Sequence, residues 1–149
     1  MLRIRYSSGD DVDIEGSAHD LLTIRQAVEE LVKTGHESVT VSTAVDFDPA
    51  PYERTLRHLQ LRISDRNIAL VTDDCLIVSG NVDFLESFAR DLPWDAKQPE
   101  SGVQYHVHLD RLSYGPEVDE SSIGMILSLR READGPLIQD VFEDFHHSG

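Results

Sequence analysis

Residues 12–24, VDIEGSAHDLLTI, decide the fold because residues 76–88, LIVSGNVDFLESF, have the same layout. In both stretches an alternating apolar and polar run reaches a glycine, then a polar capping residue and an amphipathic helical pattern. Gly16 aligns with Gly80, an offset of 80 − 16 = 64 residues. Similarity at a fixed spacing indicates a repeated structural unit, so the sequence predicts a tandem duplication.

The flanking sequence extends each copy to a ββαββ unit. A strand and a polar turn precede each stretch. After it, residues 39–63 and 105–129 share an alternating strand, a Pro-containing connection and a second alternating strand, at an offset of 105 − 39 = 66. The predicted repeats cover about residues 2–64 and 67–131, within one domain of residues 1–131.

Capping residues bound both predicted helices. Ser17 can cap the first, with Asp20 three residues on and Gly35 as the stop. Asn81 can cap the second, which Pro93 ends. The first helix has apolar residues at helical spacing: Leu21, Ile24, Val28, Leu31 and Val32.

The pattern predicts an α+β fold in which a long, mostly antiparallel sheet carries both helices on one face. The alternative is two separate four-stranded sheets packed together. The other face of the sheet would be polar, because alternate strand residues point the same way. Its expected members are Asp11, Asp13, Glu15, Thr40, Ser42, Gln60, Arg62, His106, His108 and Asp110.

Residues 132–149 lie outside the duplication and are expected to form a C-terminal tail or short helix. Leu137, Val141, Phe142 and Phe145 recur at helical spacing after Gly-Pro. We expect this apolar stripe to pack against the domain, because exposed Phe and Leu are costly. The alternative is a tail that binds a partner.

The chain of 149 residues has 13 Lys and Arg against 28 Asp and Glu, a net charge of −15. This charge disfavours nucleic acids and anionic membranes and would attract a basic protein. The alternative is that it only maintains solubility. Cys75 is the only cysteine, which excludes an intramolecular disulfide, and no apolar stretch resembles a signal peptide or a membrane span. A cytoplasmic location is expected.

Residues 105–110, YHVHLD, place two imidazoles on one side of a strand, the arrangement in which an H-x-H pair can bind zinc. His106, His108 and Asp110 are the candidate metal ligands. Two or three ligands do not define a metal site, so the favoured interpretation is a solvated or partner-facing histidine pair, with no cofactor.

No catalytic constellation can be assembled from the sequence. Ser121 and Ser122 lack a nucleophile elbow, and Cys75 lies in an apolar run. A reactive cysteine requires an electropositive, accessible environment, which an apolar run does not supply. The sequence also lacks a phosphate-binding glycine loop and a zinc-protease helix motif.

Four residues are candidates for contact with a protein partner. Asp11, Asp13 and Glu15 form an acidic corner of the expected polar face, and Trp94 follows the second helix. Tryptophan often anchors an interface. For Trp94 the favoured alternative is that it covers the end of the core.

Residues 75–93, CLIVSGNVDFLESFARDLP, with YHVHLD and the later DESSIGMILSL, resemble the immunity protein 32 family of bacterial immunity proteins that accompany polymorphic toxins. The resemblance covers about residues 75–130. It implies a cytoplasmic inhibitor that binds a cognate toxin, and it implies no catalytic residue.

The leading hypothesis is therefore a non-enzymatic acidic binding protein, most concretely an antitoxin that covers a basic toxin. A metal-binding enzyme or small-ligand domain centred on His106 and His108 is the second hypothesis. The third is an assembly protein, such as a homodimer, that associates through exposed sheet edges.

Overall fold

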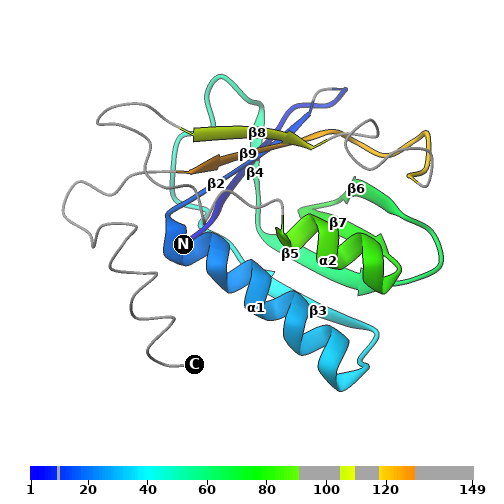
Figure 1. The fold of residues 1–149 in the computed structure, drawn as a ribbon. Coiled ribbons are helices and arrows are strands. Elements are labelled where there is room, and N and C mark those ends of the chain that lie inside the picture. The colour runs from blue at the N-terminus through cyan, green and yellow to red at the C-terminus, as the bar shows by residue number, and fades with distance from the viewer. Residues whose placement is uncertain (10, 91–104, 110–117, 130–149) are drawn as a thin grey trace.

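The computed structural model describes residues 1–9, 11–90, 105–109 and 118–129, with the backbone alone in 105–109. These residues form an α+β fold, as predicted (Figure 1). The helices are α1 (Ala18–Thr34) and α2 (Val82–Arg90). The strands are β1 (Arg3–Tyr6), β2 (Val12–Gly16), β3 (Ser38–Ser42), β4 (Arg54–Leu56), β5 (His58–Ile63), β6 (Ile68–Thr72), β7 (Cys75–Gly80), β8 (Tyr105–Leu109) and β9 (Met125–Leu129).

The described strands form two sheets. Sheet A has the order β4-β1-β2-β9-β8, and sheet B has the order β3-β5-β7-β6. The structure thus differs from the single long sheet that the sequence favours and is closer to the alternative of two sheets. The short strand β4, which the sequence pattern does not mark as a strand, adds the fifth strand of sheet A.

Exchange of strands between the two halves of the chain explains this arrangement. In sheet A, β2 pairs in parallel with β9, and Val12 lies opposite Met125. In sheet B, β7 pairs in parallel with β5, and Leu76 lies opposite Leu59. Each sheet therefore joins the first hairpin of one half to the last strands of the other half. The two halves repeat one topology, whereas the duplication of the sequence stays a prediction.

Both predicted helix starts are confirmed. The Ser17 hydroxyl accepts a hydrogen bond from the Asp20 backbone N–H at 3.2 Å, and the Asp20 carboxylate accepts one from the Ser17 N–H at 3.1 Å. Gly35 ends α1 in the left-handed region with φ 72°. The Asn81 side chain accepts from the Phe84 N–H at 2.9 Å at the start of α2. The predicted stop at Pro93 lies outside the described residues.

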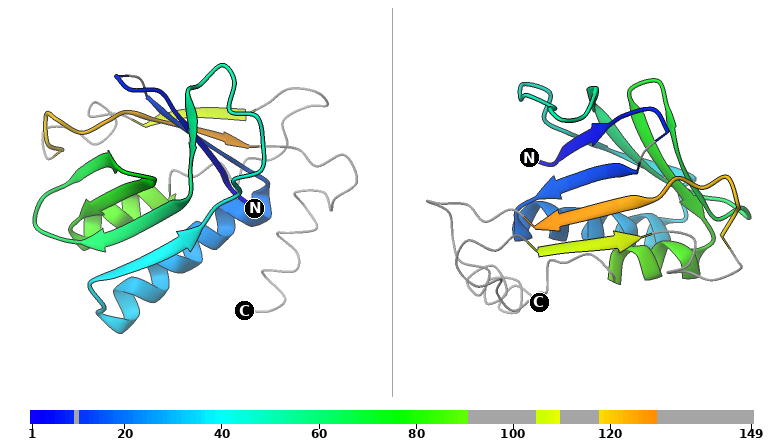
Figure 2. Two further views of the ribbon diagram at one scale, coloured as in Figure 1. Left: turned by 180° about the vertical axis from the view of Figure 1, so that it is seen from behind. Right: turned by 90° about the horizontal axis from the view of Figure 1, so that it is seen from above.

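One hydrophobic core connects both sheets and both helices. Helix α1 packs against α2, β3 and β2, while α2 packs against β7 and β5, so the helices lie side by side (Figures 1 and 2). Its largest fully buried side chains are Phe88, Ile4, Ile14, Leu21, Ile24, Leu31, Leu56, Leu59, Leu61, Leu76 and Leu85.

A segment before β9 covers the outer edge of β6. The Asp119 N–H donates to the Asn67 carbonyl at 2.9 Å, and the Ile123 N–H donates to the Ala69 carbonyl at 2.8 Å. The Ser122 hydroxyl accepts from the Ala69 N–H at 2.8 Å. These bonds occupy backbone groups that an open edge would present to another strand.

Candidate functional site

The polar residues expected on one sheet face are divided between two sheets. Asp13 and Glu15 lie in β2 of sheet A. Four others lie in β3 and β5 of sheet B: Thr40, Ser42, Gln60 and Arg62. The exchange of strands between the two halves causes this division, so the predicted continuous polar face does not form.

A compact group of four charges, here called the charged cluster, lies on sheet A. It consists of Arg3, Arg5, Asp13 and Glu15, from adjacent antiparallel strands in which Arg5 is opposite Asp13 and Arg3 is opposite Glu15. The Arg5 guanidinium donates two bonds to Asp13 Oδ2, at 2.6 and 3.0 Å, and a third to Glu15 at 3.3 Å. Arg3 Nη1 is 3.6 Å from Glu15 Oε1.

Burial makes the charged cluster part of the sheet and not an open acidic surface. Asp13 is only 4% exposed, and the Ser128 hydroxyl also donates to its Oδ1 at 3.3 Å. A buried carboxylate needs such partners, because removing its charge from water is costly. The two arginines therefore balance the charge of Asp13 and Glu15 inside the fold.

Both arginines of the charged cluster also hold a loop. Residues 43–53 connect β3 to β4 and are here called the acidic loop. The Arg3 guanidinium lies 5.2 Å from the centroid of the Phe47 ring, and that of Arg5 lies 5.3 Å from the Tyr52 ring. Each contact is a cation–π interaction worth about 0.5–2 kcal/mol.

Backbone hydrogen bonds anchor both ends of the acidic loop. The Ala44 N–H donates to the Leu2 carbonyl at 2.8 Å, and the Glu53 N–H donates to the Ser7 hydroxyl at 3.0 Å. Pro49 and Pro51 restrict the chain between these anchors, since each fixes its own φ angle. The loop therefore has a defined position on sheet A.

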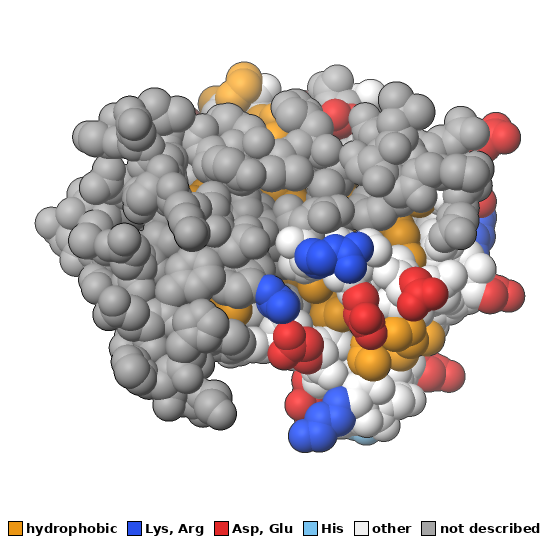
Figure 3. All heavy atoms as spheres, viewed as in Figure 1, with side chains coloured by type: hydrophobic (Ala, Val, Ile, Leu, Met, Phe, Trp, Pro, Cys, Tyr) orange, Lys and Arg blue, Asp and Glu red, His pale blue; other side chains and the backbone are white. Residues whose placement is uncertain are grey.

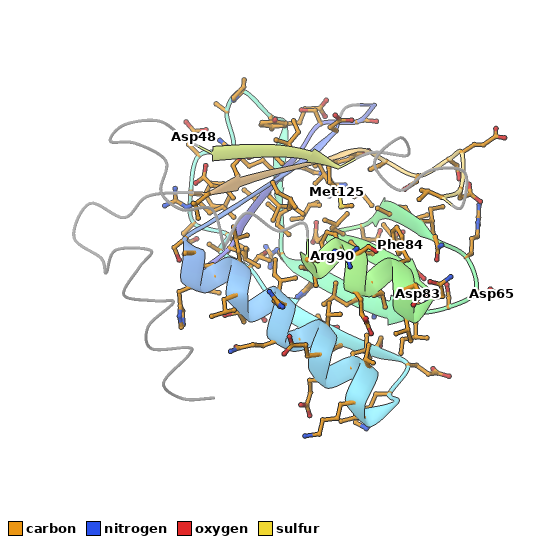
Figure 4. The ribbon with its side chains drawn as sticks, viewed as in Figure 1. Asp48, Asp65, Asp83, Phe84, Arg90 and Met125 are labelled. Atoms are coloured by element: carbon orange, nitrogen blue, oxygen red, sulfur yellow. The ribbon has the colours of Figure 1, made fainter. Side chains whose placement is uncertain are left out.

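The outward side of the acidic loop carries three exposed carboxylates. Asp46, Asp48 and Glu53 are exposed, and residues 43–53 contain no Lys or Arg. Val45, beside them, is 41% exposed. Figure 4 shows Asp48 on the opposite side of the molecule from Asp65 and Asp83. The sequence analysis passed over these carboxylates because it treated residues 43–53 only as a connection.

Asp11 stands apart from the charged cluster. Its side chain is exposed, yet its carboxylate lies against the backbone of Gly124, where an added Cβ would be 2.5 Å from Asp11 Oδ1. Of the three predicted acidic contact residues, Asp11 is therefore accessible, while Asp13 and Glu15 are engaged with arginines.

The proposed metal ligands are placed only through the backbone. In β8, His106 lies opposite Ser128 and His108 lies opposite Ile126. Their side chains, Asp110 and Trp94 lie outside the described residues. Among the side chains that are described, no group of three or more His, Cys, Asp or Glu is placed to hold a metal ion. The metal site stays a prediction.

The candidate nucleophiles have structural partners. Cys75 is half-buried, and burial raises the pKa of its thiol, which disfavours the reactive thiolate. The Ser121 hydroxyl donates to Asp119 at 2.6 Å, and Ser122 bonds the backbone of β6 as described above. These groups stabilise local structure.

Comparison with known proteins identifies no relative: no family model, no curated protein and no solved structure matches the chain. The resemblance to immunity proteins stays a prediction. No helix in the described part of the chain is long and apolar enough to cross a lipid bilayer.

Proposed function

We propose that this chain is a non-enzymatic binding protein that uses the acidic loop to bind a basic protein. One observation supports it most strongly. Three exposed carboxylates, with no cation in the same loop, project from a segment that the charged cluster anchors to sheet A.

In this proposal the acidic residues have two roles. Asp46, Asp48 and Glu53 contact the partner, because they are exposed and no Lys or Arg lies in the loop beside them. Asp13 and Glu15 act as positioning residues: they orient Arg5 and Arg3, whose guanidinium groups then hold Tyr52 and Phe47. The contact surface thus moves from β2 to the neighbouring loop.

The physical properties of the loop suit a partner that must be captured quickly. Negative charge on the exposed side accelerates encounter with a positive surface. A loop that is already anchored loses less conformational entropy on binding than a free segment would. Val45 adds an exposed apolar side chain at the same place.

The resemblance to immunity proteins supplies the most concrete partner, a basic toxin whose surface the acidic loop would cover. The net charge of −15 supports this choice because it would steer such a toxin towards the chain. Inhibition would then follow from occlusion of the toxin surface.

The test is binding to the product of the neighbouring gene, measured by stopped-flow association. The variant D46N/D48N/E53Q removes the three loop charges, and D65N/D83N/E120Q removes three exposed charges elsewhere. We expect the loop variant to lower the association rate roughly tenfold or more at low salt, with a much smaller effect of the control.

Equal losses in both variants would show that only net charge matters and would reject the loop as the contact surface. Salt-independent association would contradict a charge-driven encounter. In cells, the loop variant should also protect less well than the control against expression of the neighbouring gene, if that product is a toxin.

A further inference from the structure

A groove of about 430 Å³ runs between α1 and α2. Val28, Val32 and Ala89 contribute its apolar part, and charged side chains surround them: Arg25, Glu29, Lys33, Glu86 and Arg90. Figure 3 shows this surface over the helices, with Lys and Arg (blue) and Asp and Glu (red) around hydrophobic side chains (orange).

The cations of this groove stand out among the described residues. Six of the nine Lys and Arg in the described ranges form ion pairs with carboxylates: Arg3, Arg5, Arg25, Arg54, Arg57 and Arg66. The other three, Lys33, Arg62 and Arg90, form none within those ranges. Lys33 and Arg90 both border the groove.

We propose that the C-terminal segment of the same chain, residues 137–145, docks in this groove. Its sequence, LIQDVFEDF, combines the apolar stripe with three carboxylates, at Asp140, Glu143 and Asp144. Residues 132–149 contain five Asp or Glu and no Lys or Arg. The apolar stripe matches Val28, Val32 and Ala89, and the carboxylates match Lys33 and Arg90.

Each feature alone has a simpler explanation. Basic residues are favoured near helix C-termini, which accounts for Lys33 and Arg90 by themselves. An open apolar groove is costly if it faces water, however, and an acidic, Phe-containing segment is costly if it is left exposed. Docking one on the other removes both costs and pairs the free cations.

The connecting chain is long enough. Strand β9 ends at Leu129, which lies opposite Gly16, just before α1 begins. From there to Val32 the helix rises roughly 21 Å, at 1.5 Å per residue. Residues 130–136 can span roughly 23 Å when extended, so residue 137 can reach the groove. The docking needs no rearrangement of the sheets.

Digestion of the full chain with chymotrypsin tests this inference through cleavage at Phe142 and Phe145, analysed by mass spectrometry. The variant K33E/R90E should expose the segment and accelerate its cleavage roughly three- to tenfold. V32D should act in the same direction. The matched control R57E/R62E makes the same change of charge away from the groove and should leave the tail cleavage rate unchanged.

Adding D140R/D144R to K33E/R90E should restore protection, which separates docking from general destabilisation. Wild-type rates of cleavage at Tyr6 and Phe84 show that each variant is folded. Equal tail cleavage in wild type, K33E/R90E and V32D would overturn the inference. Protection that increases with protein concentration would also overturn it, because the segment would then come from a second copy.

Discussion

At the scale of single residues, Arg5 connects the interior of sheet A to the acidic loop. Its guanidinium bonds the buried carboxylate of Asp13 at 2.6 Å and lies against the Tyr52 ring. Bidentate bonding fixes the plane of the guanidinium, so the ring above it has a fixed seat. A residue whose charge is neutralised can thus still determine where a charged surface is presented.

Arg5→Met should be among the most destabilising substitutions of a charged residue in this chain. It leaves Asp13 buried without its main partner, and we expect a loss of about 3 kcal/mol in the free energy of unfolding, measured in urea. Arg57→Met breaks an exposed pair of 3.8 Å and should cost about 0.5 kcal/mol or less.

The double variant R5M/D13L should recover most of that stability, because it removes the buried charge together with its partner. The acidic loop should nevertheless stay loosened, visible as faster amide exchange in residues 43–53. If R5M/D13L is as unstable as R5M, the unpaired carboxylate is not the cause of the loss.

At the scale of elements, each helix starts directly above a glycine. A Cβ on Gly16 would lie 2.9 Å from Asp20 Cβ. A Cβ on Gly80 would overlap the Phe84 ring and lie 2.5 Å from Asn67 Oδ1. The two glycines are the pair that aligns at an offset of 64 residues, and both allow the first turn of a helix to approach a strand end closely.

Gly80→Ala should therefore destabilise the fold by about 2–3 kcal/mol, because an aromatic ring and a bonded amide would both have to shift. Gly16→Ala should cost about 1 kcal/mol, since its contacts are less severe. Thermal unfolding followed by circular dichroism measures both. A larger effect at Gly16 would contradict the packing described here.

The capping box of α1 should make stability depend on pH. Burial raises the pKa of the Asp20 carboxyl, but hydrogen bonds from Ser17 and the charge of the Met1 amine outweigh burial, so the pKa lies below its ordinary 3.8. A lowered pKa stabilises the folded state at neutral pH, and this contribution disappears as pH falls below about 4.

Asp20→Asn should accordingly cost about 0.5–1 kcal/mol at pH 7, a modest value because the carboxyl is partly exposed. The difference from wild type should shrink steadily below about pH 4. Urea unfolding at pH 7, 5, 4 and 3 measures it. A difference that stays constant with pH would assign the effect to helix packing and not to the charge.

At the scale of the whole molecule, the two sheets depend on one core. Ile14 of sheet A and Leu59 of sheet B are fully buried in the same cluster. The sheets also share the chain closely, since only residue 57 separates β4 of sheet A from β5 of sheet B. We therefore expect the sheets to unfold together.

Ile14→Ala and Leu59→Ala should each cost about 3 kcal/mol, and each should lower the midpoint of one common transition. Calorimetry should give equal calorimetric and van't Hoff enthalpies for wild type and both variants. Two transitions, of which each variant shifts only one, would show that the sheets are independent.

The sequence predicts the parts that depend on neighbouring residues. The caps at Ser17 and Asn81 and the stop at Gly35 follow from local hydrogen bonds and are confirmed. The strand order depends on contacts between residues more than 100 positions apart, such as Val12 and Met125, which periodicity does not encode.

The candidate site was predicted only in part, for the same reason. The alternation in β2 correctly places Asp13 and Glu15 on one face, but their neutralisation depends on the register of β1. Likewise, the aligned repeats pair His106 with Thr40, whereas the ladders place it at the position of Ser38: Ser128 lies opposite His106, and its counterpart Arg62 lies opposite Ser38.

The exchange of strands between the halves also has a consequence during synthesis on the ribosome. Strand β2 ends at Gly16, and its neighbour β9 begins at Met125, 125 − 16 = 109 residues later. At about 5–20 residues per second, the β1–β2 hairpin waits roughly 5–20 s for that neighbour. Sheet B has its parallel pair by residue 80. The nascent chain therefore carries an open, apolar strand edge until translation is almost complete, and a message truncated before codon 125 would yield a product that keeps this edge open.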